Sequence, residues 1–259
     1  MEANNQKLKI SFLGTGTSTG VPQIGCKCKV CQSADERDNR LRASVLIERG
    51  KDRLLIDAGP DLRAQLLKAG VNGLTGVLIT HEHYDHVGGL DDIRPLGETA
   101  IYAEKRVLEH IRKVMPYCFA EKLYPGVPRI VLCPVEKSAF RVGNTDVQPF
   151  RVFHAKLPVL GYRIDNVAYI TDLKTIPDSS LEQLAGLDVL VLNALRIDEH
   201  ISHISLSEAI ELALKIGAKR TYFTHFSHDL GLHAEVQKLP SNIHVVLLSP
   251  AQWLNNPMD

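Results

Sequence analysis

Four side chains of the kinds that bind metals lie within six residues, in the run Thr80-His81-Glu82-His83-Tyr84-Asp85-His86. His81 and His83 are two residues apart, so on extended chain they point the same way and can bind one cation. Asp85 and His86 fall where the chain turns into a helix, where they can reach a second cation. Imidazole suits zinc, manganese or iron, and a carboxylate is common where a metal keeps one position open for water. This spacing predicts a metal site rather than a solvated polar turn.

The same run resembles the His-x-His-x-Asp-His signature of the metallo-β-lactamase-fold hydrolases, and the resemblance covers nearly the whole chain. In that family a later His, Asp and His each follow a strand. This chain offers them in that order, as His154 after 147–153, Asp172 after 167–171 and His225 after 220–224. The resemblance implies two divalent metal ions, manganese or zinc. Its ligand sets are His81, His83 and His154 for one metal and Asp85, His86 and His225 for the other, with Asp172 bridging them.

Three thiols, Cys26, Cys28 and Cys31, are spaced Cys-x-Cys-x-x-Cys. They lack one ligand of a closed tetrahedral zinc site. Nothing nearby resembles a thioredoxin βαβ unit, which disfavours a redox pair, and three free thiols are the other alternative. We expect His228, three residues beyond His225, to be the fourth ligand of a structural zinc ion. With this loop the chain resembles the phosphoribosyl 1,2-cyclic phosphate phosphodiesterases of the carbon–phosphorus lyase pathway of phosphonate breakdown.

That resemblance implies a dinuclear metal-dependent phosphodiesterase, a phosphoric diester hydrolase. Its expected reaction converts 5-phosphoribosyl 1,2-cyclic phosphate to ribose 1,5-bisphosphate by attack of a metal-bridging hydroxide. Two cations about 4 Å apart can orient a phosphodiester and stabilise charge on the attacking and leaving oxygens. Asp85 and Asp172 would take part in catalysis through the metals.

A proton donor for the leaving oxygen is the remaining requirement, and two histidines outside the metal spacing are candidates. His203 lies immediately before a helix with a capping box, so its position is well defined. A histidine with a near-neutral pKa is a natural general acid for a leaving alkoxide, and the resembling family has a histidine at this place. His200 lies on looser chain and is the second candidate, or a substrate-binding residue. Arg94 has a guanidinium fork that fits phosphate; the alternative is a surface ion pair with Asp91 or Asp92.

Short strands and few helices are expected to position these residues. Strands at 44–48 and 53–57 form a hairpin, and a helix runs from 61 to 69. Asp57, at the end of the hairpin, matches a further family motif and is expected to orient neighbouring backbone and histidines rather than bind metal. Ser205 and Glu208 form a capping box for a helix that Gly217 ends. The predicted apolar face of this helix consists of Leu206, Ala209, Ile210, Ala213 and Leu214.

Two strand-rich halves, each with helices, predict an αββα sandwich. This is the α/β (α+β) architecture of the metallo-β-lactamase type, with two packed mixed sheets and helices on the outer faces. No linker or composition shift divides the chain, so we expect one domain over 1–259, with a zinc-binding loop at 25–31. Residues 99–144 are the least informative. A strand at 99–102 and a helix at 104–114 suggest a variable cap near the site. Tyr117, Phe119 and Tyr124 are expected to pack in the core, and the alternative is that they line a pocket.

Composition limits the partners. The 259 residues include 30 basic and 30 acidic side chains, giving a formal net charge of zero, and 44% are hydrophobic. No overall field attracts nucleic acid or an anionic membrane, no apolar run approaches the ~20 residues of a membrane span, and residues 1–7 show no signal peptide. We therefore expect a cytoplasmic protein with a small phosphodiester substrate and no membrane partner, and leave a homodimer open.

Three other functions stay open. A tRNA 3′-processing endonuclease uses the same seven ligands, but the zero net charge and the lack of a basic arm disfavour a nucleic-acid partner. A thioester or lactam hydrolase is compatible with the ligands alone. A non-catalytic binding protein of the same fold is the alternative from another class.

Overall fold

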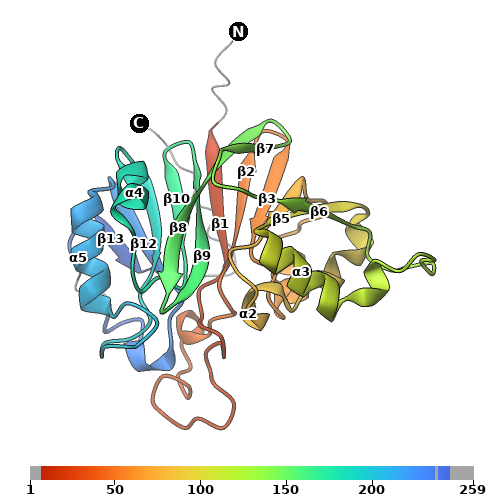
Figure 1. Ribbon diagram of the computed structural model, residues 1–259. Helices are drawn as coiled ribbons and strands as arrows, with labels where there is room; N and C mark the ends of the chain where they lie inside the picture. Colours follow the sequence, from red (N-terminus) through yellow and green to blue (C-terminus); the bar gives the residue numbers. More distant parts are fainter. Residues whose placement is uncertain (1–6, 237–238, 246–259) are drawn as a thin grey trace.

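The computed structural model describes residues 7–236 and 239–245. The prediction that residues 1–7 form no signal peptide therefore falls almost entirely outside the described residues. No helix in the described ranges is both long and apolar enough to cross a membrane. The chain folds into two sheets that face each other, with helices on their outer sides (Figure 1).

The first sheet has six strands in the order β1-β2-β3-β4-β5-β6. Strands β1, β2 and β3 pair antiparallel, whereas β3, β4, β5 and β6 pair parallel. The hairpin is therefore confirmed, with β3 starting at Asp52. The bounds are β1 (Leu8–Gly14), β2 (Ser44–Arg49), β3 (Asp52–Ile56), β4 (Gly76–Leu78), β5 (Thr99–Ala103) and β6 (Ile130–Pro134).

The second sheet has seven strands in the order β13-β12-β11-β10-β9-β8-β7. Strands β10 to β13 pair parallel, and β7 to β10 pair antiparallel. Strands β8 and β10 consequently run in the same direction. The bounds are β7 (Phe140–Val142), β8 (Thr145–His154), β9 (Leu157–Ile164), β10 (Val167–Ile170), β11 (Val189–Asn193), β12 (Arg220–Thr224) and β13 (Ile243–Val245).

Three apolar clusters match the layers. Between the sheets, Ile47 and Ile56 of the first sheet share a cluster with Tyr162 and Tyr169 of the second. Helices α1 and α3 bury their apolar sides on the outer face of the first sheet, and α5 does so on the second. The predicted αββα sandwich is thus confirmed. The helices are α1 (Leu62–Lys68), α2 (Tyr84–Val87), α3 (Lys105–Val114), α4 (Asp178–Leu181) and α5 (Leu206–Ile216).

Helix α5 begins and ends as the sequence predicts. Ser205 and Glu208 form the reciprocal capping box, and Gly217 ends the helix in a left-handed conformation with φ 70°. One residue of the predicted apolar face is wrong, because Leu214 is 53% exposed. The apolar face of α5 is shifted around the helix rather than lost, since Leu212 and Ile216 pack against the cluster that contains Ala209 and Ala213.

Residues 99–144 are more closely integrated than a variable cap. Strands β5 and β6 extend the first sheet and β7 begins the second. Short 3₁₀ helices replace regular helix at Glu36–Asp38, Leu90–Leu96, Pro116–Cys118, Glu182–Leu184 and His228–Leu230. Tyr117 and Phe119 pack against the outer core of the first sheet, but Tyr124 is 52% exposed, so its predicted core packing is wrong. It belongs to the loop that extends beyond α3 (Figure 1).

Candidate metal centre

All seven expected metal ligands come from one edge of the sandwich. The His81–His86 run follows β4, His154 is the last residue of β8, and Asp172 and His225 follow β10 and β12. Because β8, β10 and β12 run in the same direction, their carboxyl ends meet at the same edge of the second sheet. The structure thus brings together residues that lie up to 144 positions apart.

Asp172 lies at the centre of this group. Its carboxylate falls within 4.8 Å of ligand atoms in three separate clusters: with His81 and His86, with His83 and His154, and with His203 and His225. A fourth cluster joins Asp85, His86 and His225. Asp172 is 2% exposed. Burial alone would raise the pKa of its carboxyl, but the imidazoles of His225, His86 and His81 hold that pKa well below its usual range.

The distances fit cation ligands. Nε2 of His86 lies 3.0 Å from Asp85 Oδ2 and 3.2 Å from Asp172 Oδ2, and Nε2 of His225 lies 3.3 Å from Asp172 Oδ2. Two N or O ligands of a tetrahedral zinc ion, each at ~2.0–2.2 Å, are about 3.3–3.6 Å apart, so one of the three distances matches that spacing and the other two are slightly shorter. Among the described residues these two buried nitrogens have no hydrogen-bond partner. A bound cation would satisfy them, so the residues fit a metal centre.

Groups outside the centre hold the histidine rings. Asp57 is fully buried and its Oδ2 lies 2.7 Å from His86 Nδ1. It also accepts from Thr80 N at 2.9 Å and from the Thr80 hydroxyl, and that hydroxyl lies 3.0 Å from His81 Nδ1. Nδ1 of His154 donates to the carbonyl of Ser202 at 2.7 Å. These contacts aim Nε2 of His86, His81 and His154 inward, as the predicted orienting role of Asp57 requires.

A close backbone approach supports this arrangement. A Cβ on Gly59 would lie 2.0 Å from the carbonyl oxygen of Asp85, so only glycine fits there. Asp57, Asp172 and His225 all have left-handed backbone, with φ of 63°, 55° and 61°. Each turns the chain sharply at the end of a strand and directs a polar side chain inward.

His203 lies against the centre, as the sequence predicts. Its Nδ1 is 3.9 Å from Asp172 Oδ1, and its ring centroid is 4.4 Å from that of His154. Its neighbours are tied to the ligand segments, because Ser202 accepts from His154 and Ile204 N donates to Leu173 O at 3.0 Å. The expected near-neutral pKa is not found: burial lowers the pKa of His203 to about 3.

The other two candidate substrate residues differ in position. His200 lies beside His203, with ring centroids 5.2 Å apart. Burial, and then the charge of Arg196, lowers the pKa of His200. Arg94 instead forms an exposed ion pair with Asp91 at 2.6 Å. This is the surface ion pair predicted from the sequence as the alternative to phosphate binding.

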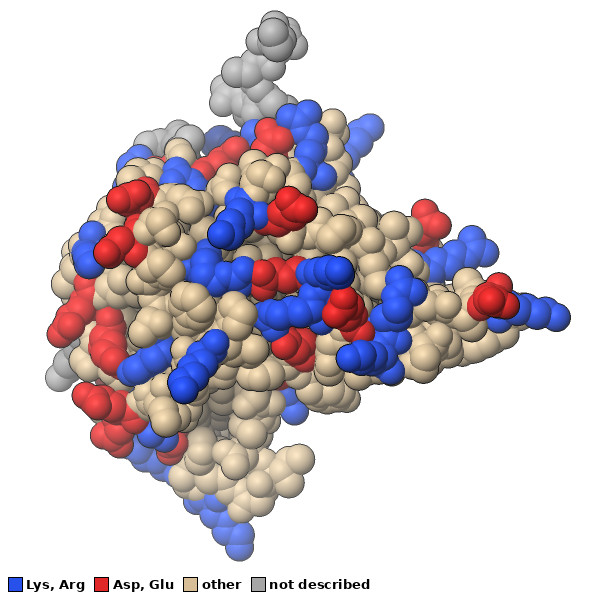
Figure 2. All heavy atoms as spheres, in the orientation of Figure 1, with Lys and Arg blue, Asp and Glu red and all other residues tan. Residues whose placement is uncertain are grey.

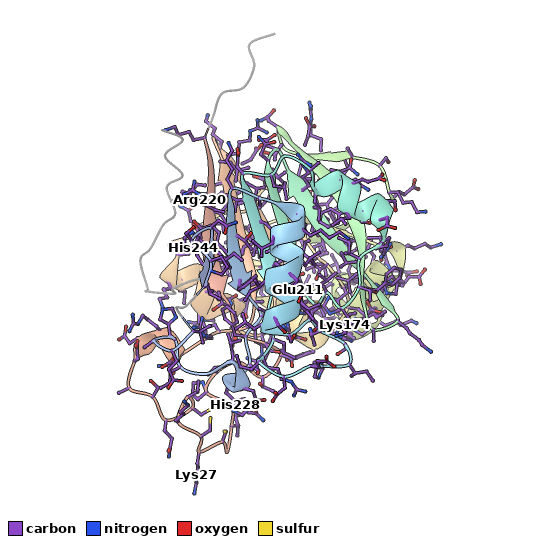
Figure 3. All side chains as sticks on the ribbon, turned by 90° about the vertical axis from the view of Figure 1, so that its left-hand side faces the viewer. Lys27, Lys174, Glu211, Arg220, His228 and His244 are labelled. Carbon is purple, nitrogen blue, oxygen red and sulfur yellow. The ribbon has the colours of Figure 1, made fainter. Side chains whose placement is uncertain are left out.

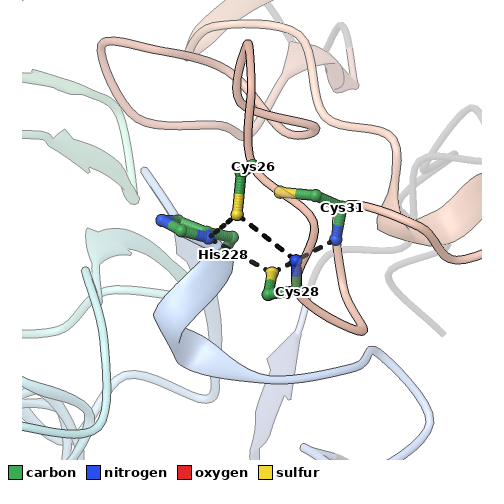
Figure 4. Close-up of side chains that lie close together, drawn as sticks. All are labelled: Cys26, Cys28, Cys31 and His228. Carbon is green, nitrogen blue, oxygen red and sulfur yellow. Dashed lines mark hydrogen bonds between the residues drawn. The ribbon is translucent and has the colours of Figure 1, made fainter.

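The thiol cluster also assembles. Cys26, Cys28, Cys31 and His228 offer ligand atoms within 4.8 Å of one another. Nδ1 of His228 lies 3.3 Å from Sγ of both Cys26 and Cys28 (Figure 4). Figure 3 places His228 at the lower end of the molecule, above the loop that carries Lys27 and away from α5. The loop is therefore held to the segment that follows His225.

The comparisons agree with this geometry. The β-lactamase superfamily domain matches residues 52–226. The crystal structure of a diphosphatase from the PhnP family has a TM-score of 0.87 and 38% identity, covering 93% of this chain and 94% of that one. The chain therefore belongs to the β-lactamase superfamily and, within it, lies close to the PhnP family.

Two curated relatives differ in length. The octanoyltransferase of Porphyromonas gingivalis is 45% identical over 92% of this chain. The chain spans 50% of that relative, so the name belongs to a protein about twice as long as the matched segment. Ribonuclease Z of Mycobacterium bovis is 25% identical, covering 89% of this chain and 90% of that one.

Proposed function

We propose that the chain is a metal-dependent phosphodiesterase for small phosphodiesters, with 5-phosphoribosyl 1,2-cyclic phosphate as substrate and ribose 1,5-bisphosphate as product. The observation that carries the proposal is the buried carboxylate of Asp172, shared by three clusters of ligand atoms. The 38% identity to a PhnP-family diphosphatase supports chemistry at phosphorus. The cyclic ribose phosphate follows from the resemblance of the ligand run and the thiol loop.

In this proposal His81, His83 and His154 hold one divalent metal, manganese or zinc, and Asp85, His86 and His225 hold the other, with Asp172 between them. When bound, two such cations lower the pKa of a water molecule and stabilise charge on the phosphoryl oxygens. The chain's own part is to aim these ligands, as Asp57 does for His86 through Nδ1. Burial, and then the nearby charge of His86, lowers the pKa of His81 well below its usual value, so its ring is neutral and free to bind metal.

His203 would serve the leaving oxygen. In the metal-free protein its ring is neutral at pH 7, because burial lowers its pKa. A phosphodiester anion beside the ring would oppose that shift, since a nearby negative charge favours the imidazolium. The ring, whose Nδ1 lies 3.9 Å from Asp172 Oδ1, can then donate a proton to the departing oxygen.

The Cys26–Cys28–Cys31–His228 group would hold a structural zinc ion. Thiolates and imidazole suit zinc, and the pKa of Cys28 is lowered to about 6, chiefly by a hydrogen bond from the Cys31 N–H and then by His228. A thiol that ionises this easily is ready to bind a cation.

Processing of tRNA 3′ ends is the second candidate, because the match to ribonuclease Z covers most of both chains. The zero net charge disfavours it, since RNA binding needs an excess of cations near the backbone phosphates. Figure 2 shows Lys and Arg mixed with Asp and Glu over one face, without a basic stripe.

The test is a substrate panel with manganese or zinc: ribose cyclic phosphates, 2′,3′-cyclic nucleotides, bis-p-nitrophenyl phosphate, pre-tRNA, thioesters and a lactam. Asp172→Ala should fall below ~1% of wild-type turnover, a larger loss than the ~10–100-fold cost of outer groups around a metal. The control is Asp146→Asn, because Asp146 forms an exposed ion pair with Arg141 at 2.7 Å. Cleavage of pre-tRNA alone would favour the second candidate. Wild-type protein with bound metal but no turnover on the panel would refute the enzyme.

A further inference from the structure

The two sheets contact each other along β9, next to the metal-binding run. The hydroxyl of Tyr162 donates to Ile79 O at 2.7 Å, and Leu160 N donates to Thr80 O at 3.0 Å. Pro158 lies two residues before Leu160, so their backbone polar groups point to the same edge of β9. Proline has no N–H, so β9 cannot donate to the chain beyond Thr80 in the same way.

Arg106, the second residue of α3, occupies this third position. Its guanidinium donates from Nη2 to the carbonyl of Pro158 and from Nη1 to the carboxylate of Glu82. Nη2 also lies 3.4 Å from Glu104 Oε2. The two carboxylate oxygens of Glu104 in turn accept hydrogen bonds from the guanidinium of Arg151. The Arg106 side chain is 31% exposed and that of Glu82 is 24% exposed. These charges form a continuous row across the junction of the sheets.

The row joins the two parts of one proposed metal site. Glu82 lies between His81 and His83 in the ligand run, and Arg151 precedes His154 by three residues on β8. Successive side chains of extended chain point to opposite sides. A Glu82 side chain held outward by Arg106 therefore turns His81 and His83 inward.

Of the four histidines around this site, His83 depends most on the contacts of Arg106 for the direction of its ring. Asp57 orients His86, Thr80 contacts His81, and the Ser202 carbonyl orients His154. Within the described residues, the hydrogen-bonding contact of His83 is with His81, Nδ1 to Nε2 at 3.0 Å, inside the site itself. Its ring is exposed, so the backbone on either side sets its direction.

We infer that Arg106 is a positioning residue, which fixes His83 toward the metal through Glu82 and Pro158. The inference rests on the proposed metal centre. The expected effect of Arg106 on metal affinity is opposite to the effect of its charge, because a nearby positive charge repels a cation. If Arg106 acted only through its charge, removing it would strengthen metal binding; if it positions His83, removing it weakens metal binding.

The test measures Mn²⁺ binding to metal-stripped protein by electron paramagnetic resonance of the free ion, because thiolates select zinc and leave manganese to the His/Asp site. Wild type should bind two Mn²⁺ ions. Arg106→Gln should weaken one of them by ~10–100-fold, the usual cost of an outer group around a metal, and leave the other unchanged. Arg106→Lys should weaken it too, because one ammonium cannot replace a two-armed fork. Arg141→Gln, which removes an exposed ion pair with Asp146, is the control.

The outcomes separate the two proposals. Wild-type protein that binds no metal would overturn the proposed function and this inference together. Two sites in wild type with equal or tighter binding in Arg106→Gln would overturn only this inference. Wild-type affinity in Arg106→Lys would show that the two-armed contact with Glu82 and Pro158 is not what positions His83, and would overturn the inference as well. A lower urea midpoint with unchanged Mn²⁺ affinity would mean that Arg106 stabilises the fold without positioning His83.

Discussion

Replacing Asp57 by asparagine should separate metal binding from folding. In the native protein the carboxylate accepts from Thr80 N, from the Thr80 hydroxyl and from His86 Nδ1. An asparagine can still accept from Thr80 N, and its amide can donate to the hydroxyl. Its NH₂ group then faces His86 Nδ1, which must become the acceptor. The proton of His86 moves to Nε2, the atom that lies 3.2 Å from Asp172, and that nitrogen can no longer bind a metal.

The magnitudes follow from those bonds. Losing one charge-assisted hydrogen bond costs ~1.5–3 kcal/mol of unfolding free energy, a fraction of the ~5–15 kcal/mol of a typical domain. Metal affinity should fall by ~10–100-fold at the site that uses His86. Asp57→Ala also leaves the buried Thr80 N–H without an acceptor, so it should cost about 3–6 kcal/mol.

The assay pairs urea unfolding of the metal-free protein with Mn²⁺ titration. Asp52→Asn is the matched control, because Asp52 is also buried on β3 and accepts from Asn144 N and the Thr145 hydroxyl far from the metal centre. It should lose stability without losing metal. Asp57→Asn with wild-type metal affinity would refute the tautomer argument.

Three further predictions address the other groups. His203→Ala should reduce turnover of ribose cyclic phosphate by ~10²–10⁴-fold and that of bis-p-nitrophenyl phosphate much less, because the nitrophenolate needs no proton; equal losses would mean that His203 positions the phosphate instead. In metal-free protein at pH 7, iodoacetamide should label Cys28 before Cys31, because the pKa of Cys28 lies at about 6 and burial raises that of Cys31 to about 11. Zinc should protect both, and equal labelling rates by mass spectrometry would contradict this. Ser205→Ala should lower the unfolding free energy by ~1 kcal/mol through loss of the cap, read by urea unfolding; no change would show that the box at Glu208 adds nothing.

The sequence predicted best what local spacing encodes. The two-residue step from His81 to His83, the strand before each later ligand and the capping box at Ser205 are written in neighbouring residues, and the structure places them as expected. The hairpin β2–β3 and the αββα layers could be predicted from the same kind of short-range pattern. The strands are buried on both faces, so they appear in the sequence as short apolar runs.

What failed depends on contacts between distant residues. Arg106 lies 24 residues from Glu82 and 52 from Pro158, and an arginine near the start of a helix has no pattern that predicts such partners. Leu214 and Tyr124 are apolar in sequence but exposed, because tertiary packing sets which side of α5 faces the sheet and how far the loop beyond α3 extends. The neutral state of His203 comes from burial, which its spacing cannot report.

The left-handed backbone at Asp57, Asp172 and His225 implies a trade between stability and activity. A side chain in this conformation costs roughly 1–2 kcal/mol per residue, and glycine pays little of it. Glycine at Asp172 or His225 would relieve this cost but would remove a group on which the metal centre depends, and at Asp57 it would also lose the bonds to Thr80 and His86, which are worth more than the backbone cost. At Asp172 and His225 the chain keeps conformations that it would lose if it were selected only to fold.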